Sequence, residues 1–498
     1  MTVVLGGGIS GLSAAYYAAN EARLASVTLL EASDRVGGWI RSRRSPSGAI
    51  FEQGPRTVRP HGPAGMNTLD MIDDLQLTHK LIRINASHPI AQNRLIYSEQ
   101  ALHMLPMSLK GLFKTISLLD RPLVNCLWTD LKAPKVSKED ESIYSFVQRR
   151  LGRDIADRLI SPIICGVCAG DARQISVNFM MKSLFEAEQK HGSIVKGFLA
   201  KKLKKVFSRS KSKETKEARA INDATMGRVV QLEKLAIWSL EGGLEQLPLA
   251  LADNLEKRGV TMETGTKCER LTFKADRVEL SASGDVREYS RVISSLPAKS
   301  LAELLQEQHP ELSAELRAIP SVTVAVVNLE YPGDVLPLQA FGFLIPPEEN
   351  LPLLGVIFDS CMVPKESATS TVCTLFFPRS RLDFVHVAIH KARHSSVFFI
   401  CHTYTTGVNN HDGRRVVRET LRAESDGGTA VKDGGRRSEG YLIHHGGTRS
   451  APRSRPEGLY SAARGGSRST CETYPRLHFH AQHPPGTVWL LIRRGGNQ

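Results

Sequence analysis

The first residues whose types and spacing could do chemistry are Gly6, Gly8 and Gly11, which form a G-x-G-x-x-G series. In such a series the first glycine permits a tight turn, the second lets the backbone approach a pyrophosphate, and the third lets a helix pack closely on a strand. Glu31 follows Gly11 by 20 residues, where a carboxylate would meet a ribose hydroxyl. The pattern predicts a dinucleotide site, and the alternative is a glycine turn without a ligand.

Three elements must position these residues. Residues 2–5 (TVVL) predict a buried parallel strand, residues 10–19 predict a helix, and residues 26–31 (SVTLLE) predict a second strand that ends at the acid. The N-terminus of the helix would face the phosphates of the ligand. We therefore expect a doubly wound, Rossmann-like α/β domain.

A second glycine turn follows the acid. The stretch ASDRVGGWIRS contains Asp34, Arg35, Gly37 and Gly38, and it is similar to the second signature of the flavin-containing amine oxidase superfamily. In that superfamily the turn lies near the flavin diphosphate and ring, so the resemblance implies FAD rather than NAD. An ordinary hairpin turn is the alternative for this element taken alone.

Further stretches make the resemblance more specific. Five stretches between residues 48 and 260, taken together in their order along the chain, closely resemble the protoporphyrinogen oxidase family, and the resemblance extends over residues 2–375. They are GAIFEQGPRTVRP (48–60), HPIAQNRLIYSEQALHMLP (88–106), SPIICGVCAGDARQISV (161–177), LFEAEQKHGSI (184–194) and WSLEGGLEQLPLALADNLEKRGV (238–260). The resemblance implies oxidation of protoporphyrinogen IX to protoporphyrin IX by FAD and molecular oxygen, with H2O2 as by-product, in haem biosynthesis.

The resemblance also implies roles for individual residues. Arg94 would face a propionate of the substrate, and Gly170 and Leu344 would line the macrocycle pocket; the alternatives are a surface arginine and plain core. Arg56 could equally be a surface charge. No side-chain general base and no metal ligand is predicted. The implied FAD contacts are Gly6, Gly7, Gly8, Ile9, Ser10, Gly11, Glu31, Ala32, Trp39, Gly54, Pro55, Arg56, Thr57 and the backbone of Cys268.

The implied organisation is discontinuous. We expect the FAD-binding domain to comprise residues 1–60 and 236–300, and a substrate-binding sheet to comprise residues 301–375. A helical, membrane-facing substrate region would occupy residues 61–235 as an insertion. Leu244, Leu247, Leu251 and Leu255 fall at near-helical spacing and are expected in the core.

Residues 196–219 combine an apolar stripe with a crowd of lysines, which predicts a basic amphipathic helix on an anionic membrane surface. A solvated loop with a partial helix is the alternative. No run of 18 apolar residues and no signal peptide is found. The resemblance implies the mitochondrial inner membrane, on its intermembrane-space side, while the sequence leaves the oligomeric state open, a homodimer included.

The last quarter has a different composition. Residues 376–498 hold 19 Lys and Arg against 9 Asp and Glu, which is most of the chain's net charge of +14. This location makes the overall basicity a poor argument for nucleic acid. Glycine, serine and arginine cluster there with little steady period, so we interpret the segment as a disordered or out-of-frame tail, with a real but divergent tail as the alternative. The glycine-rich C-terminal flavin motif of the family is not found in it.

Three weaker signals and two rival functions complete the sequence analysis. Cys165-x-x-Cys168 has no second pair for a zinc site, and His386, His390 and His394 lack the glutamate of an H-E-x-x-H motif, so neither predicts a metal. The eight cysteines predict reduced thiols rather than a disulfide scaffold. The rival functions are an amine oxidase or carotenoid-desaturase relative, and a flavin-free escort protein that is not an enzyme.

Overall fold

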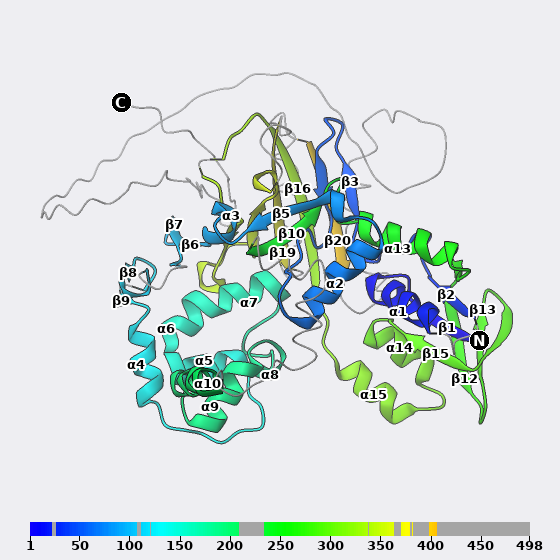
Figure 1. Cartoon of the computed structure of the whole chain (residues 1–498), viewed down its shortest axis with the longest axis horizontal. Helices are drawn as coiled ribbons and strands as arrows, with labels where there is room; N and C mark the ends of the chain where they lie inside the picture. The colour runs from blue at the N-terminus through cyan, green and yellow to red at the C-terminus, as the bar shows by residue number, and fades with distance from the viewer. Residues whose placement is uncertain are drawn as a thin grey trace, which may run out of the picture. The chain divides into compact units, whose positions relative to one another are not determined.

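The computed structural model describes residues 1–21, 26–106, 111–119, 121–208, 234–336, 338–362, 370–378, 381 and 398–405. Its first sheet is parallel, in the order β11 (Thr261–Glu263), β2 (Val27–Leu30), β1 (Thr2–Leu5) and β15 (Arg291–Ser294). The two strands and the helix expected at the N-terminus are confirmed, the helix as α1 (Ile9–Asn20). Strands β11 and β15 come from residues 261–294, so the sheet is assembled from distant parts of the chain (Figure 1).

Both faces of this sheet are covered, which explains why its strands are continuously apolar. Val4 packs into a core with α1 and α13 (Gln246–Lys257), and this core includes the four leucines at positions 244, 247, 251 and 255. Val3 and Leu5 point to the other face, as the alternation of side chains along a strand requires. There they meet an antiparallel meander of β12 (Cys268–Phe273), β13 (Val278–Ala282) and β14 (Asp285–Tyr289).

The sequence predicts that residues 61–235 form one inserted helical region. The first part of this segment instead packs with the parallel sheet and its helices. The helix α2 (Gly62–Asp74) packs Leu69 and Ile72 into the same core as α1 and α13. Strand β5 (Leu81–Asn85) then pairs with β10 (Leu235–Leu240), antiparallel. The hairpin of β3 (Ser42–Arg44) and β4 (Ile50–Glu52) completes this part of the chain.

A seven-stranded sheet forms the second large unit of structure (Figure 1). Its order is β20 (Phe398–Thr405), β16 (Thr323–Pro332), β19 (Ser370–Pro378), β18 (Gly355–Phe358), β17 (Gly342–Leu344), β6 (Leu95–Ser98) and β7 (Ala101–Met104). Strand β20 pairs antiparallel with β16, Thr405 opposite Thr323. The segment interpreted as an atypical tail therefore contributes one strand to this sheet, and residues 406–498 lie outside the described part of the chain.

A group of helices packs against one end of this sheet. Short elements lead into it: α3 (Pro89–Gln92), β8 (Thr115–Ile116) and β9 (Arg121–Pro122). Its helices are α4 (Asn125–Lys132), α5 (Ile143–Leu151), α6 (Arg153–Ile155), a π-helical turn (Ala156–Ile160), α7 (Ser161–Cys168), α8 (Val177–Met180), α9 (Lys182–His191) and α10 (Ile194–Ser208). We name residues 111–208 the helical region. Two more helices, α14 (Ala298–Leu305) and α15 (Pro310–Ala318), precede β16.

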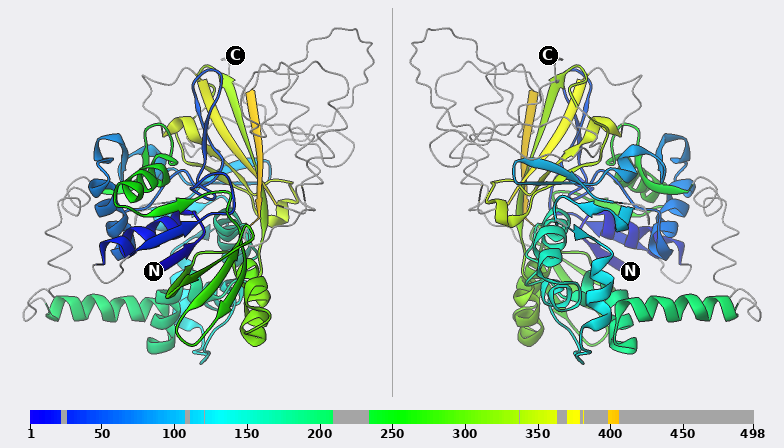
Figure 2. Two further views of the ribbon diagram at one scale, coloured as in Figure 1. Left: turned by 90° about the vertical axis from the view of Figure 1, so that its right-hand side faces the viewer. Right: turned by 90° about the vertical axis from the view of Figure 1, so that its left-hand side faces the viewer.

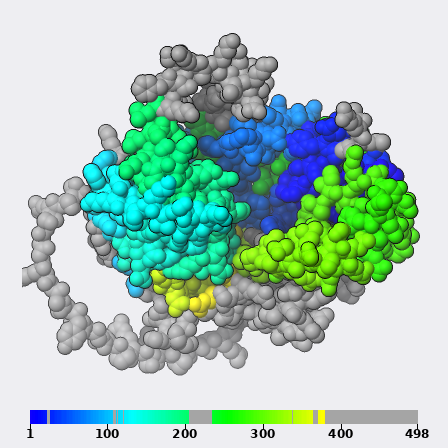
Figure 3. All heavy atoms as spheres, turned by 90° about the horizontal axis from the view of Figure 1, so that it is seen from below, coloured from blue at the N-terminus to red at the C-terminus, as the bar shows by residue number. Residues whose placement is uncertain are grey.

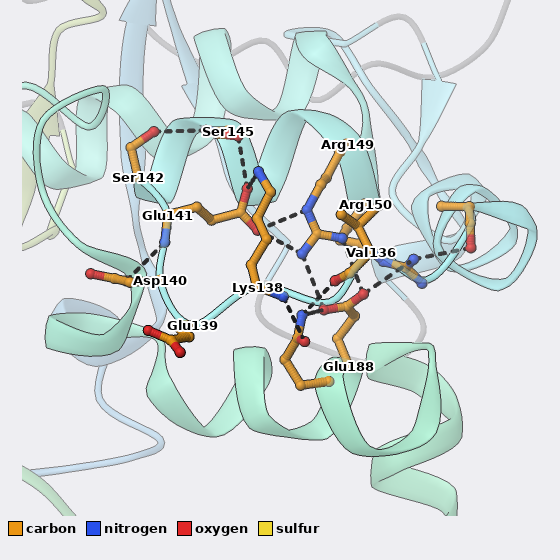
Figure 4. A network of polar contacts seen from close by, with 12 residues as sticks. Val136, Lys138, Glu139, Asp140, Glu141, Ser142, Ser145, Arg149, Arg150 and Glu188 are labelled. Carbon is orange, nitrogen blue, oxygen red and sulfur yellow. Dashed lines mark hydrogen bonds and ion pairs between the residues drawn. The ribbon is translucent and has the colours of Figure 1, made fainter.

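A buried charge network holds the helical region together (Figure 4). Arg150 is fully buried and pairs with Asp130 at 2.7 Å, while its remaining N–H groups donate to backbone carbonyls. Arg149 bridges Glu141 and Glu188, at 2.6 and 3.1 Å. Removing one member would leave a buried charge uncompensated, which costs more than the pair itself contributes. The network therefore fixes how α4, α5 and α9 pack.

The last helix of this region extends away from it, as both views of Figure 2 show. Leu199 and Leu203 of α10 are exposed, and so are Lys201 and Lys202. The predicted helix is thus present up to Ser208, and residues 209–219 lie outside the described chain. Within the described residues, no helix combines the length and apolarity needed to cross a bilayer.

Candidate active site

The glycine turn after β1 has the geometry that its sequence predicts. Gly6 adopts a φ of +102°, which favours glycine. A Cβ on Gly11 would lie 1.8 Å from the carbonyl oxygen of Gly6, so only glycine fits where α1 crosses the end of the strand. Gly8 precedes the first residue of α1 and supplies no side-chain cap. The first N–H groups of the helix are thus left for an anion.

Glu31 stands at the end of β2, directly beside this turn. One of its carboxylate oxygens accepts hydrogen bonds from the backbone N–H of Ser33 at 2.8 Å and from its hydroxyl at 2.6 Å. The other oxygen accepts from the N–H of Gly7. A carboxylate has about four acceptor positions, so one remains for a ligand hydroxyl. This fits the ribose contact expected for Glu31.

The second glycine turn lies against the first. The N–H of Gly37 donates to the carbonyl of Gly7 at 2.8 Å, and a Cβ on Gly38 would be 3.1 Å from the Cα of Gly8. Arg35 fixes this turn by donating to the carbonyls of Val36 and Gly38. The two turns together form a cradle of backbone with little side chain, which suits a diphosphate.

The loop at residues 54–57 is bound tightly to its surroundings. A Cβ on Gly54 would lie 2.0 Å from the carbonyl oxygen of Trp39, whose side chain is half exposed. The guanidinium of Arg56 is buried and donates to Asp359 at 2.8 Å, and it also stacks over Phe376 at 5.0 Å. The hydroxyl of Ser239 donates to the carbonyl of Arg56. Arg56 is therefore not a surface charge, and its loop is anchored to the seven-stranded sheet.

Asp359 is a site residue that sequence analysis missed. It follows β18 and accepts from Arg56 and from the hydroxyl of Thr374 at 2.6 Å. Burial raises the pKa of Asp359, opposed by the charge of Arg56. The available signal was a single acid at the end of an apolar strand in VIFDS, inside the segment expected to form the substrate-binding sheet.

A second acid, Glu52, joins the hairpin β3–β4 to the turn before α13. Its carboxylate accepts from the N–H of Leu244 at 2.7 Å and from the hydroxyl of Ser42 at 2.8 Å. Desolvation raises the pKa of Glu52 to about 7, although both hydrogen bonds oppose that shift. Glu52 therefore titrates near neutral pH.

Arg94 is half-buried, next to apolar residues of the seven-stranded sheet. It precedes β6, which pairs with β17 so that Ile96 lies beside Leu344. Its guanidinium stacks on Phe341 at 5.1 Å, and its carbonyl accepts from Leu105. Among the described residues no carboxylate pairs with it. Partial burial lowers the pKa of Arg94, and the nearby charge of Arg59 lowers it further.

Leu344, which is predicted to line the macrocycle pocket, packs against α7. A Cβ on Gly166 would lie 2.2 Å from a terminal carbon of Leu344. Gly170 follows α7, where its carbonyl accepts from the thiol of Cys165 at 3.4 Å. Sequence analysis missed Gly166, whose only signal was a glycine inside an otherwise apolar helix. Leu344 and Gly166 are thus neighbours, and Arg94 lies two residues before Ile96, the partner of Leu344 in β6.

Three cysteines of the described chain have the properties of ordinary free thiols. Burial raises the pKa of both Cys165 and Cys268 to about 11. Cys168 contacts the sulfur of Met180 at 3.4 Å instead of Cys165. These contacts argue against a redox dithiol. The backbone of Cys268 pairs with Ala282 in the meander next to β1 and β2.

A hollow opens between the helical region and α14–α15, with residues of the N-terminal part of the chain at its floor (Figure 3). Among the described residues, no group of three or more His, Cys, Asp or Glu could hold a metal. His386, His390 and His394 lie outside the described residues.

Comparisons with known proteins agree with this geometry. A family model described as flavin containing amine oxidoreductase matches residues 9–385. The chain is 40% identical over 368 residues to protoporphyrinogen oxidase of Homo sapiens, covering 74% of both chains. It is 28% identical over 408 residues to the protein of Nicotiana tabacum named protoporphyrinogen oxidase, mitochondrial, covering 76% and 75%. A crystal structure from an Exiguobacterium species, provisionally assigned as a protoporphyrinogen oxidase, shares the fold with a TM-score of 0.62 at 22% identity, covering 86% and 92%.

Proposed function

Since the chain belongs to the flavin-containing amine oxidoreductase family, we propose that it oxidises protoporphyrinogen IX to protoporphyrin IX in haem biosynthesis. FAD, when bound, would accept two electrons in each step, and molecular oxygen would take them from it to give H2O2. Three two-electron steps each remove one hydride from a bridging carbon and one proton, and together they take four hydrogens from the bridging carbons and two from ring nitrogens. FAD, when bound, supplies the redox chemistry, while the protein binds, orients and encloses.

The residues around the two glycine turns fit FAD. The cradle of Gly6–Gly11 and Gly37–Gly38 takes the diphosphate, with the N-terminus of α1 facing it. The free acceptor position of Glu31 takes a ribose hydroxyl. The loop at residues 54–57 and the half-exposed Trp39 flank the ring, and the backbone at Cys268 lies on the adenine side.

The observation that carries the substrate assignment is a half-buried arginine without a carboxylate, at the edge of an apolar wall. Arg94 stacks on Phe341. The apolar wall consists of Leu344 and Gly166, and Leu344 of β17 lies opposite Ile96 of β6, two residues after Arg94. A flat apolar macrocycle with propionates satisfies both features, because its ring meets the wall and a carboxylate meets the cation. A small amine would leave the arginine uncompensated.

Steady-state kinetics test this assignment. The change Arg94→Gln is expected to raise the KM for protoporphyrinogen IX about tenfold or more, because a charge-assisted hydrogen bond is lost. The matched control is Arg43→Gln, which removes the same charge from an exposed position in β3. Equal KM values for the two variants would contradict the substrate site, and turnover of a primary amine instead of the porphyrinogen would favour the amine oxidase alternative.

The membrane association belongs to the same proposal. The helical region carries exposed apolar side chains on several helices, among them Trp128 at 63%, Phe179 at 75% and Leu203 at 57% exposure. Such a density of exposed apolar area marks an interaction surface, and the lysines of α10 suit anionic lipid. We place this surface on the mitochondrial inner membrane, facing the intermembrane space, supported by the name of the tobacco relative. The proposal holds for a monomer or a homodimer.

A further inference from the structure

Arg94 has a cationic neighbour that the proposed function does not use. Arg59 follows Val58. The backbone N–H groups and carbonyls of Val58 and Trp238 in β10 form two reciprocal hydrogen bonds, each 2.9 Å long. The adjacent residue of β10, Ile237, packs in one cluster with Phe341, and Arg94 stacks on Phe341 at 5.1 Å. The Val58–Trp238 bridge thus holds Arg59 beside the strand whose Ile237 packs in one cluster with Phe341, the ring on which Arg94 stacks.

Neither arginine has a carboxylate partner among the residues that the structure describes. This sets them apart from Arg56, Arg149 and Arg150, which are all paired with buried acids. Arg94 is held in place by its backbone bond to Leu105 and by the amide of Asn93, which donates to Gln339 at 2.7 Å. These bonds fix the backbone at Arg94. Burial of its guanidinium lowers the pKa of Arg94, and the like charge of Arg59 lowers it further.

We infer that Arg59 and Arg94 together form a site for the paired carboxylates of the substrate, with Arg59 as a specificity-determining residue. The inference rests on the proposed function and deepens it. Two neighbouring propionates on one edge of a macrocycle would bring two negative charges to two uncompensated cations, and binding relieves their repulsion. The half-buried Arg94 supplies the stronger contact. Arg59 is exposed, so its contribution depends on ionic strength.

The test is a binding titration with the full chain. Protoporphyrin IX and its dimethyl ester are the probes, and their fluorescence or the quenching of tryptophan emission is the readout. Arg59→Gln is expected to weaken binding of the diacid about five- to tenfold, with a shallower dependence on salt. Binding of the ester should stay unchanged. Arg43→Gln serves as the charge-matched control.

Three outcomes decide the matter. The inference is supported if Arg59→Gln weakens binding of the diacid but not of the ester, and if the double variant with Arg94→Gln loses less binding free energy than the two single variants together. The two arginines then act on the same ligand. If Arg59→Gln binds the diacid as Arg43→Gln does, the inference is overturned and the proposed function stands. If the unmodified chain binds neither protoporphyrin IX nor its dimethyl ester, both the inference and the proposed function are overturned.

Discussion

The guanidinium of Arg56 and the carboxylate of Asp359 lie 2.8 Å apart and buried, although 303 residues separate them in the chain. Arg56 belongs to the loop that flanks the proposed flavin ring, and Asp359 follows a strand of the substrate sheet. The pair therefore joins the two halves of the proposed active site. Its hydroxyl partner Thr374 continues the contact into β19.

Asp359→Asn is expected to destabilise the protein by about 3–5 kcal/mol, because it leaves the buried charge of Arg56 uncompensated. The loop at residues 54–57 would loosen, so the variant should also retain less flavin after gel filtration. Urea unfolding and the flavin absorbance of the purified protein measure the two effects.

The control for this change is Asp253→Asn. Asp253 is exposed and pairs with Lys257 one helical turn away, so its loss should cost about 0.5 kcal/mol or less. The double change Arg56→Met with Asp359→Leu removes both charges and should recover part of the stability. A double variant no more stable than Asp359→Asn would contradict the role of the pair.

Gly166→Ala is expected to change substrate binding more than stability. The new Cβ would occupy the position of a terminal carbon of Leu344, and that side chain would move toward the substrate. We expect a KM several-fold higher with little change in the urea midpoint. Adding Leu344→Ala should restore part of the affinity by returning space. A KM that stays unchanged would mean that this wall does not meet the macrocycle.

The raised pKa of Glu52 predicts that the free energy of unfolding depends on pH. Since burial raises its pKa from 4.5 to about 7, the folded state binds more protons than the unfolded chain between these values. The free energy of unfolding should therefore fall as pH rises through this window, by on the order of 3 kcal/mol, and stay lower above it. Glu52→Gln, whose amide can still bond to Leu244 and Ser42, should lack this decline. Parallel pH profiles of the two proteins would contradict the shift.

Vesicle binding tests the membrane surface. Leu199→Ser with Leu203→Ser should reduce sedimentation of the protein with cardiolipin-containing vesicles several-fold, because each change removes exposed apolar area from α10. Leu312→Ser is the matched control, since Leu312 is half exposed on α15, outside the helical region. If the control loses as much binding as the double variant, α10 does not carry the contact.

Much of the nucleotide end could be predicted because its residues are local and their constraints are steric. Gly6, Gly11 and Glu31 act within a single strand–turn–helix–strand, and the structure places each where the pattern requires. The continuously apolar strands likewise indicated a sheet buried on both faces.

The parts that the sequence did not reveal are long-range. Asp359 becomes meaningful only once folding has brought it to Arg56, and Gly166 only once α7 meets Leu344. The sequence predicts an insertion from residue 61 onward, whereas the helix α2 packs into the nucleotide core. The sequence analysis did not predict strand β20, because the segment around it has the composition of a disordered tail. The strand sequence itself, FFICHTYT, is rich in aromatic and apolar residues.

The most direct test of the central claim is anaerobic mixing of the purified full chain, loaded with FAD, with protoporphyrinogen IX. We predict bleaching of the flavin absorbance on mixing, followed on admission of oxygen by recovery of that absorbance and by porphyrin fluorescence. Gly11→Ala, whose Cβ collides with the backbone of Gly6, should bind no flavin and oxidise no faster than the buffer alone. A flavin that stays oxidised in the loaded chain, with porphyrin forming only at the buffer rate, would contradict the account.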